Sequence, residues 1–476
     1  MVSGRPTEYG IMIRGEKIFM GKALCFDPDG YVVKCCALEG VTVQYRAYEG
    51  LEYCAAPADP IQKLNLYVPE DYYAGAHHNG YTLHTAPIFL PNTVGGYLPG
   101  PADCPGPDRF GHPNAALCAL AHGYVVACIG VRGRTSGHRN TEFFEGSKAA
   151  ASETETGRSV GKAPAFVVDL KASIRWLRHN KAQLPGDTEH IITNGTSAGG
   201  ALSALAGASG NSSEYTAELA AIGALAERDD VFAANCFCPI HNLENADTAY
   251  EWMFCGYDDF STLRMSVKDG KIVQKGTTGT QTEQQKQISR ELKALFPAYL
   301  NSLGLKDAAG HPLTLDENGN GSFLEAVKAA VQQSAQRELE THHTARKLSM
   351  LAVKGSEVEK QSYLTIKDGR VTALDWDGFR GAILRMKTAP AFDALDMMSP
   401  ENEEFGTESI ERRHFGFFSI RAGVHTPQPA AGRKHTKRQH PSQQADKQIF
   451  PVFHLDRLLS RCIRSRRPRP AGPFCS

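Results

Sequence analysis

Apolar and polar residues alternate in three short stretches near the start of the chain. In each stretch about every second side chain is apolar or aromatic, which is typical of a strand with one buried face. The stretches cover residues 31–34, 41–48 and 64–68, and Pro69 closes the last one. We therefore predict that the fold opens with antiparallel strands.

From residue 86 onward, continuous apolar runs alternate with stretches in which apolar residues recur at helical spacing. Residues 86–91 and 124–129 are apolar runs of strand length, whereas residues 165–180 repeat apolar side chains at helical spacing. Strands without a polar face are typical of a parallel sheet that is covered on both sides. We predict an α/β fold with a mostly parallel sheet and helices on both faces, including a helix at 114–122 and a strand at 230–238.

The most informative stretch is His190–Ala206, which reads HIITNGTSAGGALSALA. A short strand-like run precedes a glycine-flanked serine, and small apolar residues at helical spacing follow it. This is the context of a nucleophile elbow, in which a sharp turn lifts the serine hydroxyl clear of the backbone. We predict Ser197 as a catalytic nucleophile, with the Ala198 N–H donating to an oxyanion at the start of the helix. The alternative is a glycine-rich turn with an idle serine.

A second loop of interest, Asn92–Gly100, follows the strand at 86–91. Loops at the carboxyl ends of neighbouring parallel strands meet over the sheet. In hydrolases with an elbow, the oxyanion hole combines the N–H after the nucleophile with one from such an earlier loop. We expect that second donor to be Gly95 or Gly96, although the two glycines could serve only a turn.

Strand-like alternation ends after the strand at 230–238, and helix signals take over. Residues 283–303 and 322–339 predict two long helices rich in Ala, Gln, Glu and Lys. We therefore divide the chain into a hydrolase core at 1–240 and a large inserted, mainly helical cap at 241–420.

Composition excludes several classes of partner. A formal net charge of zero argues against nucleic acid or an anionic membrane, and no apolar run reaches the length of a membrane span. The N-terminus has no apolar signal region, so we expect a cytoplasmic protein. Because the twelve cysteines show no metal-binding spacing, we predict no metal site.

The charge is nevertheless distributed unevenly along the chain. Residues 421–476 hold 12 Lys/Arg and 2 Asp/Glu, a net charge of +10, which leaves −10 on residues 1–420. We predict that this Pro-rich basic tail is disordered. An alternative is a basic arm that binds nucleic acid or acidic partners.

Seven stretches in order along the chain carry a family resemblance: Pro91–Asp103, Ile191–Ser209, Cys238–Asp247, Ala249–Trp252, Arg385–Lys387, Pro390–Asp393 and Ser399–Asn402. Together they resemble bacterial tannases (tannin acyl hydrolases) of the lactobacillus type, from about residue 24 to 418. The resemblance implies a serine esterase with an α/β-hydrolase core and a large helical cap, acting on galloyl esters without a cofactor. It also implies Ser197 as the nucleophile, with Gly96 and Ala198 donating to the oxyanion.

The same resemblance implies a substrate site for a phenolic ester. Lys387 and Glu401 match residues that hydrogen-bond the phenolic hydroxyls of the galloyl ring, and Ile240 and Pro400 match residues that pack on its faces. A trihydroxyphenyl ring has flat apolar faces and a polar edge, so an apolar sandwich with one cation and one carboxylate suits it.

The resemblance ends near Phe418, before the expected acid and base. A serine nucleophile needs a histidine base and an acid behind it, which in this fold follow the nucleophile in the order acid, histidine. The tannase motifs Arg-His-Gly-x-x-Asp-x-Asp and Pro-His-Ser-Gly do not occur in this sequence. Asp446 and His454 have the right order, but eight residues are too few for a crossover between parallel strands. We interpret the tail as a frameshifted or foreign segment that replaces the last part of the core.

Two other functions remain open. The chain could be a feruloyl (hydroxycinnamoyl) esterase on the same scaffold. It could also be a catalytically impaired, tannase-like protein that at most binds phenolic ligands, because the acid and base of the triad are not found.

Overall fold

The computed structural model describes residues 10–13, 16–19, 24–108, 111–138, 157–268, 271–341 and 361–421. The predicted disorder of the basic tail concerns residues that, apart from Arg421, lie outside this described part.

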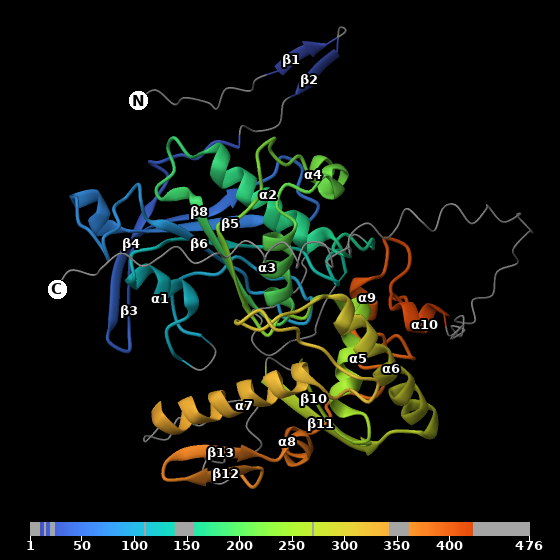
Figure 1. Ribbon diagram of the computed structural model, residues 1–476. Helices are drawn as coiled ribbons and strands as arrows, with labels where there is room; N and C mark the ends of the chain where they lie inside the picture. Colours follow the sequence, from blue (N-terminus) through green and yellow to red (C-terminus); the bar gives the residue numbers. More distant parts are fainter. Residues whose placement is uncertain are drawn as a thin grey trace, which may run out of the picture.

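A seven-stranded mixed sheet forms the centre of the molecule, with the strand order β3-β4-β5-β7-β6-β8-β9 (Figure 1). The first strands pair antiparallel, as predicted, whereas β7, β6, β8 and β9 run parallel to one another. The strands are β3 (Val32–Leu38), β4 (Val41–Glu52), β5 (Lys63–Pro69), β6 (Pro87–Pro91), β7 (Val125–Ile129), β8 (Asp187–Thr196) and β9 (Ala233–Phe237).

Helices cover both faces of the sheet. Successive side chains of β7 point to opposite faces, and each face has its own apolar cluster to cover. Val125 and Ala127 point into the larger core, which includes Trp176 of α2 (Ala165–His179) and Leu202 of α3 (Ala198–Ala208). Val126 instead joins a smaller cluster on the opposite face, under α1 (Ala115–Ala121). The predicted α/β-hydrolase architecture is thereby confirmed. Shorter helical segments of the core are η1 (Glu70–Ala74), η2 (Ser213–Tyr215) and α4 (Thr216–Ala221).

The elements after β9, which we call the cap, lie below and to the right of the sheet in Figure 1. The two predicted long helices are confirmed as α6 and α7, and α6 begins with a capping box between Thr282 and Gln285. The cap elements are α5 (Leu243–Phe254), β10 (Asp259–Lys268), β11 (Lys271–Thr280), α6 (Glu283–Ser302), α7 (Ser322–Thr341), β12 (Leu364–Lys367), β13 (Arg370–Leu374), α8 (Trp376–Ile383), α9 (Pro400–Glu404) and α10 (Phe417–Arg421).

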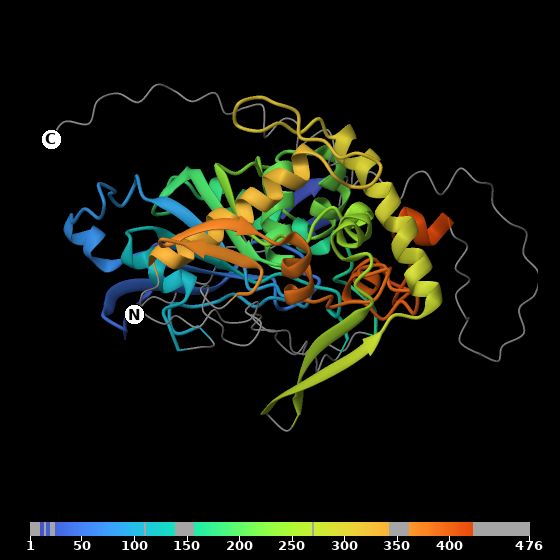
Figure 2. The same ribbon diagram turned by 60° about the horizontal axis from the view of Figure 1, so that its bottom comes forward.

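Two hairpins in the cap contradict the expectation that strand alternation ends after residue 238. The hairpin β10–β11 projects away from the rest of the molecule in Figure 2, and β12–β13 is a shorter hairpin packed near α7. Asp368 and Gly369 join β12 to β13 with φ angles of 50° and 71°, the signature of a type I′ turn. An Asp-Gly pair also separates β10 from β11 in the sequence, so the hairpin signal was present in both places.

Two further features complete the fold. An N-terminal hairpin joins β1 (Gly10–Ile13) to β2 (Glu16–Phe19). In the seven-stranded sheet, the end strand β9 pairs only with β8 among the described residues, and Phe232 and Phe237 are 63% and 54% exposed. None of the described helices combines the length and the apolar character that crossing a membrane requires.

Candidate active site

Ser197 lies at the junction of β8 and α3, where the sequence predicts an elbow. Its backbone angles, φ 59° and ψ −121°, are strained for a residue with a side chain, and α3 begins at the next residue, Ala198. The Ser197 side chain is half-buried. The chain therefore turns sharply at this serine, as it does in a nucleophile elbow.

The glycines around Ser197 are required by close backbone contacts. A Cβ on Gly195 would lie 2.2 Å from the Gly199 carbonyl oxygen, and one on Gly200 would lie 2.6 Å from the Phe237 carbonyl oxygen. A Cβ on Gly199 would lie 2.4 Å from Oδ1 of Asn92. The glycine pattern that suggested the elbow thus has a direct steric reason.

Asn92 fastens the neighbouring loop to the elbow, a role that the sequence reasoning missed. Its Nδ2 donates to the carbonyl oxygens of Asn194 at 2.8 Å and Gly199 at 3.1 Å, and its Oδ1 accepts from the Val94 N–H at 3.2 Å. One side chain therefore sets the distance between the two loops that meet over the sheet. Its position at the start of a glycine-rich loop was the available signal.

The two glycines of that loop form a tight turn over Gly95–Leu98. The Leu98 N–H donates to the Gly95 carbonyl at 3.0 Å, and Gly96 and Tyr97 have φ angles of 55° and 59°, as in a type I′ turn. Because C=O and N–H point in opposite directions across a trans peptide, this bond turns the Gly96 N–H outward. Among the described residues, that N–H has no acceptor.

The second predicted donor, the Ala198 N–H, lies at the elbow and also has no backbone acceptor within its helix. Ala198 is the first residue of α3, and the first N–H groups of a helix have no acceptor within the helix. The positive end of the helix dipole adds to the attraction for an anion at this point. Gly96 and Ala198 thus both offer free backbone donors.

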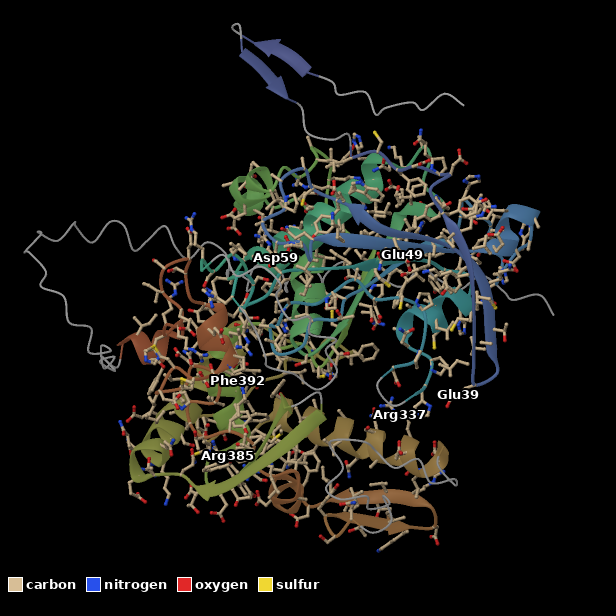
Figure 3. The ribbon with its side chains drawn as sticks, turned by 180° about the vertical axis from the view of Figure 1, so that it is seen from behind. Glu39, Glu49, Asp59, Arg337, Arg385 and Phe392 are labelled. Carbon is tan, nitrogen blue, oxygen red and sulfur yellow. The ribbon has the colours of Figure 1, made fainter. Side chains whose placement is uncertain are left out.

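Lys387 and Glu401 come together within the cap. The Nζ of Lys387 lies 3.5 Å from Oε1 of Glu401 and 4.4 Å from the centre of the Phe392 ring. The Glu401 side chain is 4% exposed, and its second oxygen, Oε2, has no hydrogen-bond partner in the described part of the chain. A buried carboxylate oxygen without a partner is costly, so this oxygen is ready to accept from a ligand. Figure 3 shows Phe392 in the cap, apart from Asp59 and Glu49 of the core.

Ile240 connects this part of the cap to the elbow. Its N–H donates to the Ser197 carbonyl at 3.2 Å, and its own carbonyl accepts from the Tyr97 hydroxyl at 2.5 Å. Burial raises the pKa of Tyr97 well above its usual range, and the charges of Glu401 and Glu404 raise it further. Pro400, the first residue of α9, directly precedes Glu401.

A general base is not found beside the nucleophile. Within the described ranges, no imidazole forms a hydrogen bond with the Ser197 hydroxyl. Nδ1 of His241 lies 3.3 Å from the Pro239 carbonyl, and Nδ1 of His414 lies 2.6 Å from Oδ1 of Asp393. The histidines and aspartates that the sequence places after residue 421 lie outside the described residues. In that described part, no group of three or more His, Cys, Asp or Glu side chains could hold a metal ion.

Comparison with known sequences finds esterases that are similar to parts of this chain. Residues 140–289 match the BD-FAE family. Two esterases of Mycobacterium tuberculosis are similar over short stretches: LipC is 46% identical over 56 residues and LipQ 36% identical over 90 residues. These stretches span only 14% of LipC and 20% of LipQ, and 12% and 19% of this chain.

Solved tannase structures match much more of the chain. Lactobacillus plantarum tannase has a TM-score of 0.74 and 41% identity, covering 86% of this chain and 82% of that one. Fusobacterium nucleatum tannase has a TM-score of 0.73 and 41% identity, with 84% and 80% covered. A tannin acyl hydrolase in complex with ethyl gallate gives 0.72 and 41%, with 86% and 81% covered. With this identity over about four fifths or more of each chain, the protein belongs to the tannase family of esterases.

Proposed function

We propose that the protein is a serine esterase that hydrolyses galloyl esters, both simple gallate esters and hydrolysable tannins, through an acyl-enzyme on Ser197. The observation that carries the proposal is the buried Glu401 carboxylate, which lies beside the Lys387 ammonium and has one oxygen without a hydrogen-bond partner among the residues that the structure describes. A ligand edge with adjacent hydroxyls can donate to the free oxygen and accept from the ammonium at the same time. The tannin acyl hydrolase with bound ethyl gallate supports this class of ligand.

The reaction divides into two acyl transfers. The Ser197 hydroxyl oxygen attacks the ester carbonyl, and the oxyanion that forms accepts from the Gly96 and Ala198 N–H groups. Collapse of this intermediate breaks the bond to the alcohol, which leaves with a proton, and water then attacks the acyl-enzyme to release gallate. Ile240 and Pro400 provide apolar contacts for the faces of the ring.

A catalytically impaired galloyl binder is the second candidate, and one observation favours it. The Ser197 hydroxyl must lose its proton during attack, and no described imidazole is hydrogen-bonded to it. Without such a base the hydroxyl is a weak nucleophile, although binding through Lys387 and Glu401 needs no base.

Hydrolysis of methyl gallate and methyl ferulate, assayed side by side, tests the proposal. We expect a preference for methyl gallate, with Ser197→Ala lowering kcat by several orders of magnitude. Ser302→Ala, which changes an exposed serine on α6, should keep the wild-type rate and serves as the control.

Each alternative gives its own result in these assays. A strong preference for ferulate would favour the feruloyl esterase and remove the galloyl assignment of Lys387 and Glu401. No turnover, together with calorimetric binding of gallate that Glu401→Gln weakens, would identify the impaired binder.

A further inference from the structure

A buried arginine holds the turn that contains Gly96. Arg134 is 3% exposed; its Nε donates to the Gly96 carbonyl at 2.9 Å, and its backbone N–H donates to the Tyr97 carbonyl at 2.8 Å. Two consecutive carbonyls of the turn thus point at one residue. Since Leu98 already holds the Gly95 carbonyl, three successive peptide groups of the turn have a fixed orientation.

The turn needs this support because of its conformation. Tyr97 has a side chain but adopts a positive φ, which is strained unless the surroundings impose it. Gly133, which precedes Arg134, runs so close that a Cβ there would lie 2.4 Å from the Tyr97 carbonyl oxygen. If the guanidinium were absent, the Gly96 carbonyl would lose its buried partner and the Gly96–Tyr97 peptide could rotate. That rotation would distort the turn in which the Leu98 N–H holds the Gly95 carbonyl and so directs the Gly96 N–H.

The other side of the same guanidinium reaches into the cap. Nη1 of Arg134 pairs with Oε2 of Glu403, which is 8% exposed and lies on α9. Arg412 contacts the same carboxylate oxygen at 3.2 Å but has no hydrogen bond to the turn. The five residues of α9 therefore present Glu401 to the proposed ring site and Glu403 to the arginine that holds the proposed oxyanion donor.

We propose that Arg134 is a positioning residue that couples the ring site on α9 to the oxyanion turn. A galloyl ring bound at Glu401 steadies α9, and the Glu403–Arg134 pair transmits this to the Gly96 carbonyl. The turn then keeps its shape, and with it the bond from the Leu98 N–H to the Gly95 carbonyl that directs the Gly96 N–H outward. The inference rests on the proposed function for the identity of the ring. The part of the inference in which Arg134 stabilises the turn does not depend on the proposed function, because it rests only on the hydrogen bonds of Arg134.

Arg134→Lys and Arg412→Lys form a matched pair of variants for the test. Both keep a positive charge for Glu403, but only the first removes the planar donor from the Gly96 carbonyl. Loss of one oxyanion donor costs about 10²–10³ in kcat, so a misplaced donor should cost on the order of 10-fold to 100-fold. We expect Arg134→Lys to lower kcat for methyl gallate by this amount with KM changed less than about threefold, while Arg412→Lys keeps kcat within about threefold.

Hydrogen exchange of the peptide covering residues 92–100 gives a readout that needs no turnover. We expect Arg134→Lys to speed exchange in this peptide but not in β5 or β7, and gallate to slow it in the wild type and not in the variant. A purely structural role would raise exchange throughout the core.

The outcomes separate the two proposals. Wild-type kcat and wild-type exchange in Arg134→Lys would overturn the inference while leaving the esterase function intact. A wild type that neither hydrolyses methyl gallate nor binds gallate would overturn the proposed function and the coupling to α9. The exchange of residues 92–100 in Arg134→Lys against Arg412→Lys would then still decide whether Arg134 holds the turn.

Discussion

Lys387 and Glu401 lie fourteen positions apart in the sequence, and the Lys387 Nζ is 3.5 Å from the Glu401 carboxylate. Only one of the two carboxylate oxygens is occupied, because Oε2 has no partner among the described residues. The pair is therefore arranged to bind a further donor. The lysine is more exposed than the glutamate, at 36% against 4%, so the glutamate sets the position of the pair.

The first prediction concerns ring recognition by this pair. Glu401→Gln should raise KM for methyl gallate by about 10-fold to 100-fold, because a hydrogen bond to a charged group contributes about 1.5–3 kcal/mol. Steady-state kinetics with methyl benzoate provide the control, since that ester lacks the hydroxyls and should be hydrolysed equally by both proteins. An equal loss on both esters would show that the variant damages the site generally.

The second prediction concerns the glycines of the elbow. Gly195→Ala should abolish activity or folding, because the new Cβ would lie 2.2 Å from the Gly199 carbonyl oxygen, a backbone atom that cannot give way cheaply. Gly276→Ala, on β11, has nothing within 4 Å and should leave both thermal stability and turnover unchanged. Circular dichroism melts and methyl gallate assays on the two variants make the comparison. A stable, active Gly195→Ala protein would contradict the elbow geometry.

A third prediction follows from the ion pair between Arg385 and Glu251, both fully buried. Nη1 of Arg385 donates to Glu251 Oε1 at 2.9 Å and to the Lys387 carbonyl at 3.1 Å. Glu251→Gln should lower the free energy of unfolding by about 3–5 kcal/mol, because the arginine keeps a buried charge without its partner.

Urea denaturation measures this loss. The pair of half-buried Lys328 and exposed Glu325 supplies the control, since Glu325→Gln should change stability by less than about 1 kcal/mol. Equal losses in the free energy of unfolding from the two substitutions would show that the buried pair contributes no more to stability than the Lys328–Glu325 pair.

The fourth prediction is a pH dependence of stability from Asp247. Burial raises the pKa of this carboxyl from 3.8 to about 7, although it accepts the N–H groups of Phe392 and Asp393. Between pH 4 and 7 the folded state therefore binds more protons than the unfolded state, and stability falls as the pH rises. The contribution of Asp247 is greatest below about pH 4 and is lost by about pH 7.

Unfolding free energies of the wild type and Asp247→Asn, measured across this pH range, check the direction. The difference, wild type minus variant, should decrease by up to about 1.4 kcal/mol per pH unit and become constant above pH 7. A difference that increases with pH would show that the pKa is lowered instead.

Local patterns were sufficient to predict the core of the fold. The strands before residue 130 and the elbow depend on alternation and on glycines, whose contacts lie within a few residues or in adjacent strands. The sequence between β10 and β11 carried a hairpin signal, because an Asp-Gly pair separates two stretches rich in Ser, Thr and Val, but helix-rich stretches on both sides favoured a helical interpretation of the whole region.

Contacts between residues far apart in the sequence could not be predicted from local patterns. The pair between Arg134 and Glu403 joins residues 269 positions apart, and no periodicity relates them. Asn92 similarly acts through residues more than 100 positions away. The roles of Lys387 and Glu401 came from the family resemblance, because isolated charged residues usually lie on the surface.

Within the part of the chain that the structure describes, β9 is paired only on the side of β8, and its outer edge has a consequence for how this protein behaves at high concentration. A strand that is paired on one side offers a row of unsatisfied backbone groups, and two exposed phenylalanines, Phe232 and Phe237, flank that row. Such an edge is a template for β-strand addition by another chain. At high protein concentration we therefore expect two copies to associate edge to edge through β9, without any unfolding of the core around Trp176.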